Sequence, residues 1–205
     1  MEVPKDIRER FRHRGGVPAI KRKLNCKTQE WKVAIFTGTG IGETDIDNLA
    51  RKFSITFPDD YSDFLKKYNG FRVTSPDYCN ITFNKVDNGF ISFDVLLGHE
   101  VSNEYFDIFT MNNELLDELS FVEHAVIIGA DPGGNYYVLI TEGGQSGVYY
   151  WDRTCLHLED VKQDYSIADE DETQHLYLVA STFQQFFDML AAQTIQQGMS
   201  VSQGL

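Results

Sequence analysis

Apolar residues recur at helical spacing in the first third of the chain. One set stands at i, i+3, i+4 and i+7, namely Ile46, Leu49, Ala50 and Phe53. This spacing predicts a helix over residues 44–53 with one apolar face. Thr44 is the predicted N-cap, and Asp45 and Asp47 fall in the first turn, where the helix dipole favours carboxylates.

A second amphipathic helix is predicted over residues 59–68. Its apolar face consists of Tyr61, Phe64, Leu65 and Tyr68. Pro58 suits a helix start, because the first turn does not need the N–H that proline lacks. Asn69-Gly70 ends the helix, since glycine readily adopts the left-handed backbone of a C-terminal cap.

Period-two alternation and short apolar runs predict strands in three other regions. Turn signals, Asp87-Asn88-Gly89 and Asp131-Pro-Gly-Gly134, separate these runs. The predicted strands lie at 33–37, within 78–97, and at 125–128, 136–141 and 148–151. The alternation places Tyr149 and Tyr150 on opposite faces of the strand. The side chain on one face belongs to the core, and the side chain on the other face is available as an aromatic anchor for a partner.

Two helical segments are predicted further along the chain. Residues 101–120 read as mostly helical, with an acidic outer side that comprises Glu114, Asp117 and Glu118. Ser181-Thr-Phe-Gln184 has the form of a capping box and opens the last helix. That helix carries an apolar face of Phe183, Phe186, Phe187 and Leu190. Residues 198–205 are predicted to be a flexible, frayed tail.

A strand, three glycines and a helix follow one another at residues 33–53, which invites a nucleotide-binding interpretation. The dinucleotide fingerprint requires glycine at the sixth position of the loop that starts at Gly38, and Glu43 stands there. A carboxylate at that point would face the pyrophosphate. We therefore interpret the loop as a flexible lead into the helix and predict no cofactor.

Charge is distributed very unevenly along the chain. Residues 1–32 hold ten Lys/Arg against four Asp/Glu, whereas residues 33–205 hold eight against 27, for a total of −13. After Lys85 the cations are Arg153 and Lys162, against 20 carboxylates. Such a body should repel nucleic acid and attract a basic protein. The alternative is that the acidity serves solubility alone.

Length and composition favour one globular domain in a reducing compartment. The chain has 205 residues, enough for a single core, and lacks an apolar stretch of the roughly 18–20 residues that span a bilayer. Met1–Arg14 is charged and has no apolar core of a secretory signal. Cys26, Cys79 and Cys155 are scattered, which argues against a disulfide framework. We predict a cytoplasmic protein; the sequence does not indicate its oligomeric state.

Catalytic and metal-binding patterns are weak. The five histidines form no paired-ligand spacing, and the closest fragment is Cys155-x-His157. The run Asp169-Glu-Asp-Glu172 lacks the ligand spacing and the glycine of a calcium loop. A Cys–His nucleophile stays open, because such partners meet in space rather than in sequence. We predict no enzyme activity, no catalytic residue and no metal.

Three segments, in this order, resemble the SMI1/KNR4 family, also called the SUKH superfamily. The match covers about residues 43–195, and its motifs are Phe57-Pro58-Asp59-Asp60-Tyr61 with Phe64-Leu65 and Asn69-Gly70, Ile128-Gly-Ala-Asp-Pro-Gly-Gly134 with Gly147-Val-Tyr-Tyr-Trp-Asp152, and Leu178-Val-Ala-Ser-Thr-Phe-Gln-Gln-Phe-Phe187. The sequence departs from the family pattern at Ala50, Asn135 and Arg153, where acidic residues, aspartate and histidine are frequent.

The resemblance implies an α+β fold, a curved, mainly antiparallel sheet packed with helices, without an agreed catalytic site. We assign residues 43–197 to this single domain and residues 1–42 to a basic N-terminal extension with a glycine-rich end. Many bacterial relatives are immunity proteins that block polymorphic toxins, often nucleases, whereas fungal relatives are regulators or scaffolds linked to cell-wall synthesis.

Two functional hypotheses follow. The first is an immunity protein whose acidic surface binds a basic toxin domain, through Glu114, Asp117, Glu118, Asp169, Glu170, Asp171 and Glu172. The second is a scaffold or regulatory module. Neither involves nucleic acid, a membrane or a cofactor.

Overall fold

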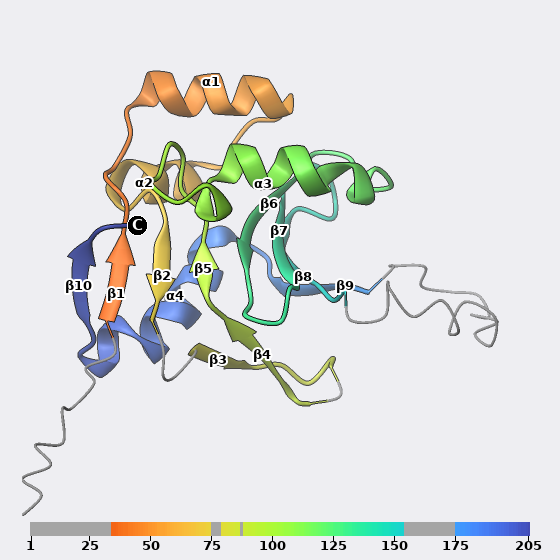
Figure 1. Cartoon of the computed structure of the whole chain (residues 1–205). Coiled ribbons are helices and arrows are strands. Elements are labelled where there is room, and N and C mark those ends of the chain that lie inside the picture. Colours follow the sequence, from red (N-terminus) through yellow and green to blue (C-terminus); the bar gives the residue numbers. More distant parts are fainter. Residues whose placement is uncertain (1–33, 75–78, 87, 154–174) are drawn as a thin grey trace, which may run out of the picture. The chain divides into compact units, whose positions relative to one another are not determined.

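An eight-stranded sheet organises the computed structural model, in which residues 34–74, 79–86, 88–153 and 175–205 are described (Figure 1). The strands in sheet order are β10 (Ser200–Gln203), β1 (Ala34–Thr37), β2 (Phe71–Val73), β5 (Val95–Leu96), β6 (Ala125–Ala130), β7 (Tyr136–Ile140), β8 (Gly147–Trp151) and β9 (Leu176–Ala180). Neighbours pair antiparallel except β1 and β10, which are parallel. The predicted α+β class is confirmed.

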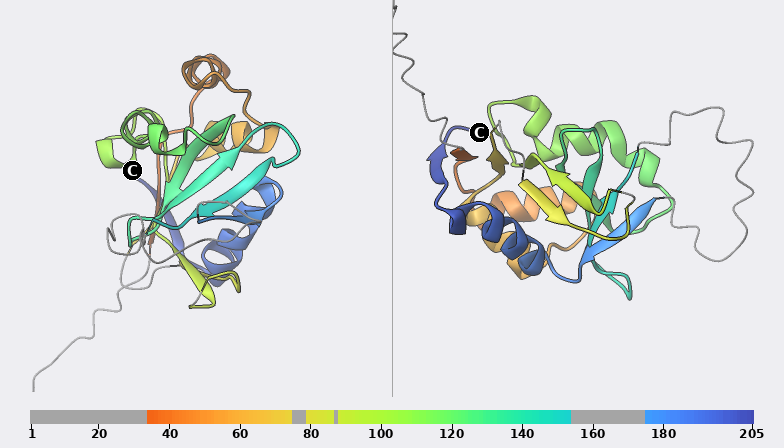
Figure 2. Two further views of the ribbon diagram at one scale, coloured as in Figure 1. Left: turned by 90° about the vertical axis from the view of Figure 1, so that its right-hand side faces the viewer. Right: turned by 90° about the horizontal axis from the view of Figure 1, so that it is seen from below.

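Helices cover both faces of this sheet. Their bounds are α1 (Glu43–Phe53), α2 (Asp59–Lys67), α3 (Ile108–Leu115) and α4 (Phe183–Gln193), with short 3-10 turns η1 (Glu104–Phe106), η2 (Leu116–Leu119) and η4 (Ile195–Gln197). Helix α3 lies against one face, and α2 and α4 lie against the other (Figure 2). A small hairpin of β3 (Cys79–Thr82) and β4 (Phe90–Phe93) forms a second sheet that contacts α4.

Aromatic rings fill the layer between the sheet and the helices α2 and α4. Tyr61 and Phe64 from α2 meet Phe183 from α4 at centroid distances of 4.8 and 5.1 Å. Tyr137 of β7 reaches Phe186 at 4.9 Å. Edge-to-face and tilted contacts of this kind add to the burial of large apolar surfaces. The predicted apolar faces of these helices therefore do form the core.

A buried asparagine joins the opposite helix to the sheet. Asn112 is 2% exposed, and its Nδ2 donates to the main-chain oxygens of Ile108 and Ile127 at 2.8 Å each. Its Oδ1 accepts from Ile127 N at 2.8 Å. A buried amide is tolerated because all these hydrogen bonds are made. The link fixes α3 against β6 and so sets where the acidic outer side of α3 points.

Two predicted helix caps are wrong by one or two residues. The N-cap of α1 is Gly42, and Thr44 lies inside the helix. In α4 the N-cap is Thr182, whose Oγ1 accepts from Gln185 N at 3.2 Å, whereas Ser181 Oγ donates to Gln185 Oε1. The capping pattern of Thr182 and Gln185 has the same spacing as that of Ser181 and Gln184, and the structure uses the later pair.

The expectation of a frayed tail at residues 198–205 is also wrong. Gly198 turns the chain with φ 83°, and β10 then pairs with β1 in register Ala34↔Ser200 to Thr37↔Gln203. Leu205 is 8% exposed, and its main-chain oxygen accepts from Ser102 Oγ at 2.8 Å. Because β1 belongs to the same sheet, the structured domain begins before residue 43, contrary to our assignment of residues 1–42 to an extension.

Candidate functional site

The predicted acidic side of residues 101–120 faces outward in the structure. Glu114 lies in the last turn of α3, and Asp117 and Glu118 lie in η2. All three side chains are exposed. We call these three residues the α3–η2 surface. The sequence contains no lysine or arginine between residues 86 and 152, so a cation that pairs with any of them must come from another segment of the chain.

Glu118 differs from its two neighbours because it binds a cation. Arg153 Nη2 donates to Glu118 Oε1 and Oε2 at 2.8 and 2.7 Å. The guanidinium also lies 4.9 and 5.3 Å from the ring centroids of Trp151 and Tyr136. Burial raises the pKa of the Tyr136 phenol, although Arg153 opposes the shift. Glu118 is thus held in place, whereas no lysine or arginine of the described residues pairs with Glu114 or Asp117.

The Asp131-Pro-Gly-Gly134 turn is organised by one carboxylate. Asp131 Oδ1 accepts from Gly133 N at 2.7 Å and Asn135 N at 2.9 Å, and Oδ2 accepts from Tyr150 Oη at 2.8 Å. Asn135 in turn accepts from Arg153 N at 2.8 Å. The departures from the family pattern at Asn135 and Arg153 are therefore in direct contact. The turn is structural, as predicted.

The aromatic anchor expected on β8 is largely absent from the surface. Tyr150 and Trp151 are both buried, at 5% and 2% exposure; Tyr150 packs on Tyr137, and Trp151 packs on Tyr136 and Arg153. Tyr149 is half-buried, and its hydroxyl donates to Gln145 O at 2.8 Å. Large exposed apolar side chains lie elsewhere, at Phe90, Tyr105, Phe121, Leu178 and Val201.

Several predicted positions lie outside the described residues. They are Asp169, Glu170, Asp171 and Glu172 of the acidic run, and Cys155 and His157 of the two-ligand fragment. Within the described ranges, no three His, Cys, Asp or Glu side chains are grouped as a metal site would require.

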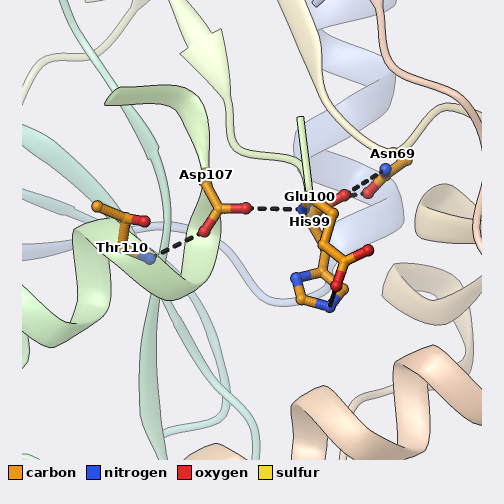
Figure 3. A network of polar contacts seen from close by, with 5 residues as sticks. All are labelled: Asn69, His99, Glu100, Asp107 and Thr110. Carbon is orange, nitrogen blue, oxygen red and sulfur yellow. Dashed lines mark hydrogen bonds and ion pairs between the residues drawn. The ribbon is translucent and has the colours of Figure 1, made fainter. Parts of the chain in front are cut away.

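A network of buried polar groups, which local sequence patterns did not reveal, surrounds His99 (Figure 3). Asn69 Nδ2 donates to His99 O at 2.8 Å, and His99 N donates to Asn69 Oδ1 at 2.7 Å. Asp107 Oδ2 accepts from Glu100 N at 2.7 Å, while its Oδ1 caps α3 through Thr110 N at 2.9 Å. The short loop from His99 to Asp107 is therefore fixed at both ends.

The backbone of this network includes two non-glycine residues with positive φ. Asn69 has φ 43° and Glu100 has φ 54°. Asparagine tolerates this region, whereas glutamate rarely adopts it. The side chain of Glu100 is 87% exposed, and its Oε1 lies 3.9 Å from His99 Nε2. His99 itself is 9% exposed, and its Nδ1 has no hydrogen-bond partner among the described residues.

A hollow of about 430 Å³ opens beside this network. We call it the His99 hollow; its lining includes Gly40, Asp45, Asn69, His99, Glu100 and Ser102. The glycine-rich loop at residues 38–42 forms one wall. A Cβ at Gly38 or Gly40 would collide with the main-chain oxygen of Asn69 or Lys66, so close packing on the end of α2 explains both glycines.

A second, larger groove of about 870 Å³ lies between α1 and α2. Its floor includes Ile46 and Phe57, and its rim carries Glu43, Asp47, Asp59 and Asp63. Lys66 Nζ lies 2.5 Å from Glu43 Oε2 and 3.9 Å from Asp63 Oδ1. The hydrogen bond to Glu43 raises the pKa of Lys66. This partial neutralisation makes the groove less acidic than its carboxylates alone suggest.

These features define an α+β domain with acidic hollows and an acidic helical surface. The SMI1/KNR4 family (SUKH-1) model matches residues 40–189, and the chain belongs to this family. The predicted resemblance is thereby confirmed. The family includes immunity proteins and is generally non-enzymatic. A comparison with curated proteins found no match. None of the described helices has the length and apolar character needed to cross a membrane.

Proposed function

We propose that the protein is a non-enzymatic binding protein that neutralises a basic toxin domain. The observation that carries the proposal is the α3–η2 surface, on which Glu114 and Asp117 are exposed and lack a lysine or arginine partner among the described residues. Membership of a family that includes immunity proteins supports the toxin as partner. The compartment that we propose is the cytoplasm.

Electrostatics would act mainly on the speed of association. The segment 33–205 carries a large excess of carboxylates, which gives it a negative electrostatic field. Salt limits the range of this field to about one Debye length, roughly 8–10 Å at physiological ionic strength. A basic partner would be steered towards the α3–η2 surface, and salt would weaken this steering. The acidic run at residues 168–172 belongs to the same proposal.

The test begins with a search of the neighbouring genes for a toxin domain, which then serves as the partner in the binding assay. Glu114→Gln with Asp117→Asn should lower the association rate constant by about three- to tenfold at low salt and flatten its salt dependence. A matched control, Glu142→Gln with Asp188→Asn, removes two exposed carboxylates elsewhere and should change the rate less. The four-fold change of residues 169–172 to serine should act in the same direction as the first variant.

Inhibition is measured separately, as growth of cells that express the toxin domain. Protection by the natural protein supports the immunity function, whereas binding without protection favours a scaffold or regulatory module. An acidic partner, or association rates that do not respond to Glu114 and Asp117, would contradict the electrostatic proposal.

A further inference from the structure

A hollow of about 690 Å³ opens between the link from η2 to β6 and the turn that joins β7 to β8. We call it the Phe121 hollow. Its apolar lining consists of Phe121, Val122, Ile140, Tyr149 and Leu176. The last four are buried or half-buried, whereas Phe121 is 42% exposed. The hollow therefore combines an apolar lining with one large ring that is open to solvent.

Exposed carboxylates stand at the rim of this apolar lining. They are Glu123 from the link and Glu142 from the turn, and no lysine or arginine of the described residues lines the hollow. His124 Nδ1 lies 4.0 Å from Glu142 Oε2, within ion-pair distance when the imidazole is protonated. Glu123 has no ion-pair partner of this kind among the described residues and carries most of the free charge of the rim.

The Phe121 hollow is continuous with the α3–η2 surface along the chain. Phe121 stands two residues after the end of η2, and Val122 N donates to Leu119 O at 2.8 Å. At the other end of the link, Thr141 N donates to His124 O at 3.0 Å. The hydrogen bonds hold the link at both ends, so the hollow is formed in advance. Binding there needs little ordering of loops, which lowers its entropic cost.

We propose that the Phe121 hollow is the anchor point of the basic protein partner, which inserts one aromatic side chain there and brings lysine or arginine to the rim. Protein interfaces commonly combine an apolar anchor in a pocket with a polar rim. Charge selects the partner, because an acidic segment would meet repulsion from Glu123 and from the adjoining α3–η2 surface.

This inference rests on the proposed function for the basic character of the partner, and it divides the work between two places. The carboxylates of the α3–η2 surface act on the association rate, since rim charges steer the encounter. The apolar contact at Phe121 acts on the dissociation rate, where most affinity differences between related complexes arise.

The probe is the tripeptide N-acetyl-Arg-Trp-Arg-amide, titrated into the full chain and followed by NMR of the amides of Phe121, Glu123 and Gly144. Saturable shifts are expected with a Kd on the order of 1 mM, as for a few side chains alone. N-acetyl-Arg-Ala-Arg-amide lacks the aromatic anchor, and N-acetyl-Glu-Trp-Glu-amide reverses the charge. Each should bind at least about tenfold more weakly. Equal binding of either control peptide would overturn the proposal.

Two variants locate the site on the protein. Phe121→Ser removes the exposed ring and should weaken binding of the tripeptide by about tenfold. Its matched control is Phe90→Ser, because Phe90 is similarly exposed, at 45%, but lies on β4 and does not line the hollow. Thermal unfolding confirms that both variants fold.

Gly144→Arg tests the same site by obstruction. A Cβ at Gly144 would meet no atom within 4 Å, so the fold accommodates a side chain there. The arginine adds bulk and positive charge at the rim and should abolish saturation by the tripeptide, whereas Gly144→Ala should bind it normally. Unchanged affinity in either Phe121→Ser or Gly144→Arg would overturn the proposal.

Other occupants of the hollow give distinct results in the protein without peptide. A second copy of the chain would make the signals of the Phe121 ring depend on protein concentration. Nuclear Overhauser effects between this ring and residues 1–32, independent of concentration, would assign the hollow to the basic segment of the same chain. Either result would overturn the assignment to a separate basic partner.

The peptide titration separates this inference from the proposed function, because it requires no toxin. If the tripeptide binds as expected but no basic toxin is found, the hollow stands and the immunity function fails. With a toxin domain as partner, Phe121→Ser should raise the dissociation rate constant about tenfold and leave the association rate constant within about twofold. If the toxin is steered by Glu114 and Asp117 while Phe121→Ser leaves its dissociation unchanged, the function stands and the hollow is not the anchor.

Discussion

Asn69 and His99 are thirty positions apart in the chain and exchange two hydrogen bonds, of 2.8 and 2.7 Å. The side-chain amide of Asn69 thus hydrogen-bonds to both main-chain groups of His99, as the main chain of a neighbouring strand would. Asn69 is 3% exposed, so water cannot substitute for this pairing. The asparagine of the Asn69-Gly70 motif therefore links the end of α2 to the loop that presents Glu100.

Replacing Asn69 with alanine should lower the free energy of unfolding by about 2–4 kcal/mol, because it leaves two buried main-chain groups of His99 unpaired. Alanine also tolerates a φ of 43° less well than asparagine does. Urea denaturation measures the change. Asn113→Ala, on the exposed side of α3, should change stability by less than about 0.5 kcal/mol. Equal effects of both variants would contradict the link.

Two buried tyrosines should respond in opposite directions to loss of the hydroxyl. Tyr61 is fully buried, and its Oη has no hydrogen-bond partner among the described residues. Tyr137 is equally buried, but its Oη donates to Ser92 O at 2.5 Å. Tyr61→Phe should raise the free energy of unfolding by about 1 kcal/mol, and Tyr137→Phe should lower it by about 0.5–1.5 kcal/mol. A loss of stability in Tyr61→Phe would show that its hydroxyl has a partner.

Local patterns predicted the parts of this fold that depend on neighbouring residues. The apolar periodicity of Ile46 to Phe53 and of Tyr61 to Tyr68 indicated α1 and α2, because one buried face suffices to define such a helix. The turn at Asp131 to Gly134 was also predictable, because its signal lies in four adjacent residues. Caps were less certain, since Ser181 and Thr182 offer the same side-chain oxygen one residue apart.

Contacts between distant segments could not be predicted in this way. The segment that forms β10 has a single large apolar residue, Val201, so its own sequence carries almost no strand signal. Its pairing depends on the free edge of β1, which is 166 positions away in the register Ala34↔Ser200. The His99 hollow combines four separate segments, and no local motif joins Asp45 to Glu100.

Stability should fall at alkaline pH through buried acids that are held neutral. Burial raises the pKa of the Cys79 thiol to about 11, from an ordinary value of 9.0, and it also raises the pKa of Tyr137. The folded state therefore binds these protons more tightly than the unfolded state. The stability contribution of Cys79 is complete below about pH 9 and is lost as the pH rises towards 11.

Urea denaturation at pH 8, 9.5 and 11 measures this loss. Cys79 should account for up to about 2 kcal/mol of it, so the decline should be shallower in Cys79→Ala after correction for the cavity at pH 8. Parallel curves for the two proteins would show that the thiol does not titrate differently on folding.

The aromatic core between α2 and α4 should be sensitive to truncation. Phe64 is 4% exposed and contacts the rings of Tyr61, Phe183 and Phe187. Phe64→Ala should lower the free energy of unfolding by about 3–5 kcal/mol through lost burial and a residual cavity. Phe121→Ala removes a ring that is 42% exposed and should cost clearly less. Similar costs at both positions would contradict this placement of Phe64 in the core.

The last strand should stabilise the edge of the sheet. Removal of residues 199–205 would expose the outer edge of β1, delete the buried side chain of Leu205 and leave without an acceptor the two groups of Ser102 that donate to Leu205 O. The lost burial and hydrogen bonds should together lower the free energy of unfolding by about 2–4 kcal/mol. Leu205→Ala separates the contribution of the Leu205 side chain from that of the β10 backbone, because it keeps β10. It should lower the free energy of unfolding by about half as much.

Hydrogen exchange tests the pairing of β10 with β1 more directly. The amides of β1 should exchange faster in the truncated chain and at nearly the normal rate in Leu205→Ala. If truncation leaves exchange in β1 unchanged, β10 does not pair with β1 in solution, and residues 198–205 are the frayed tail that their composition predicts.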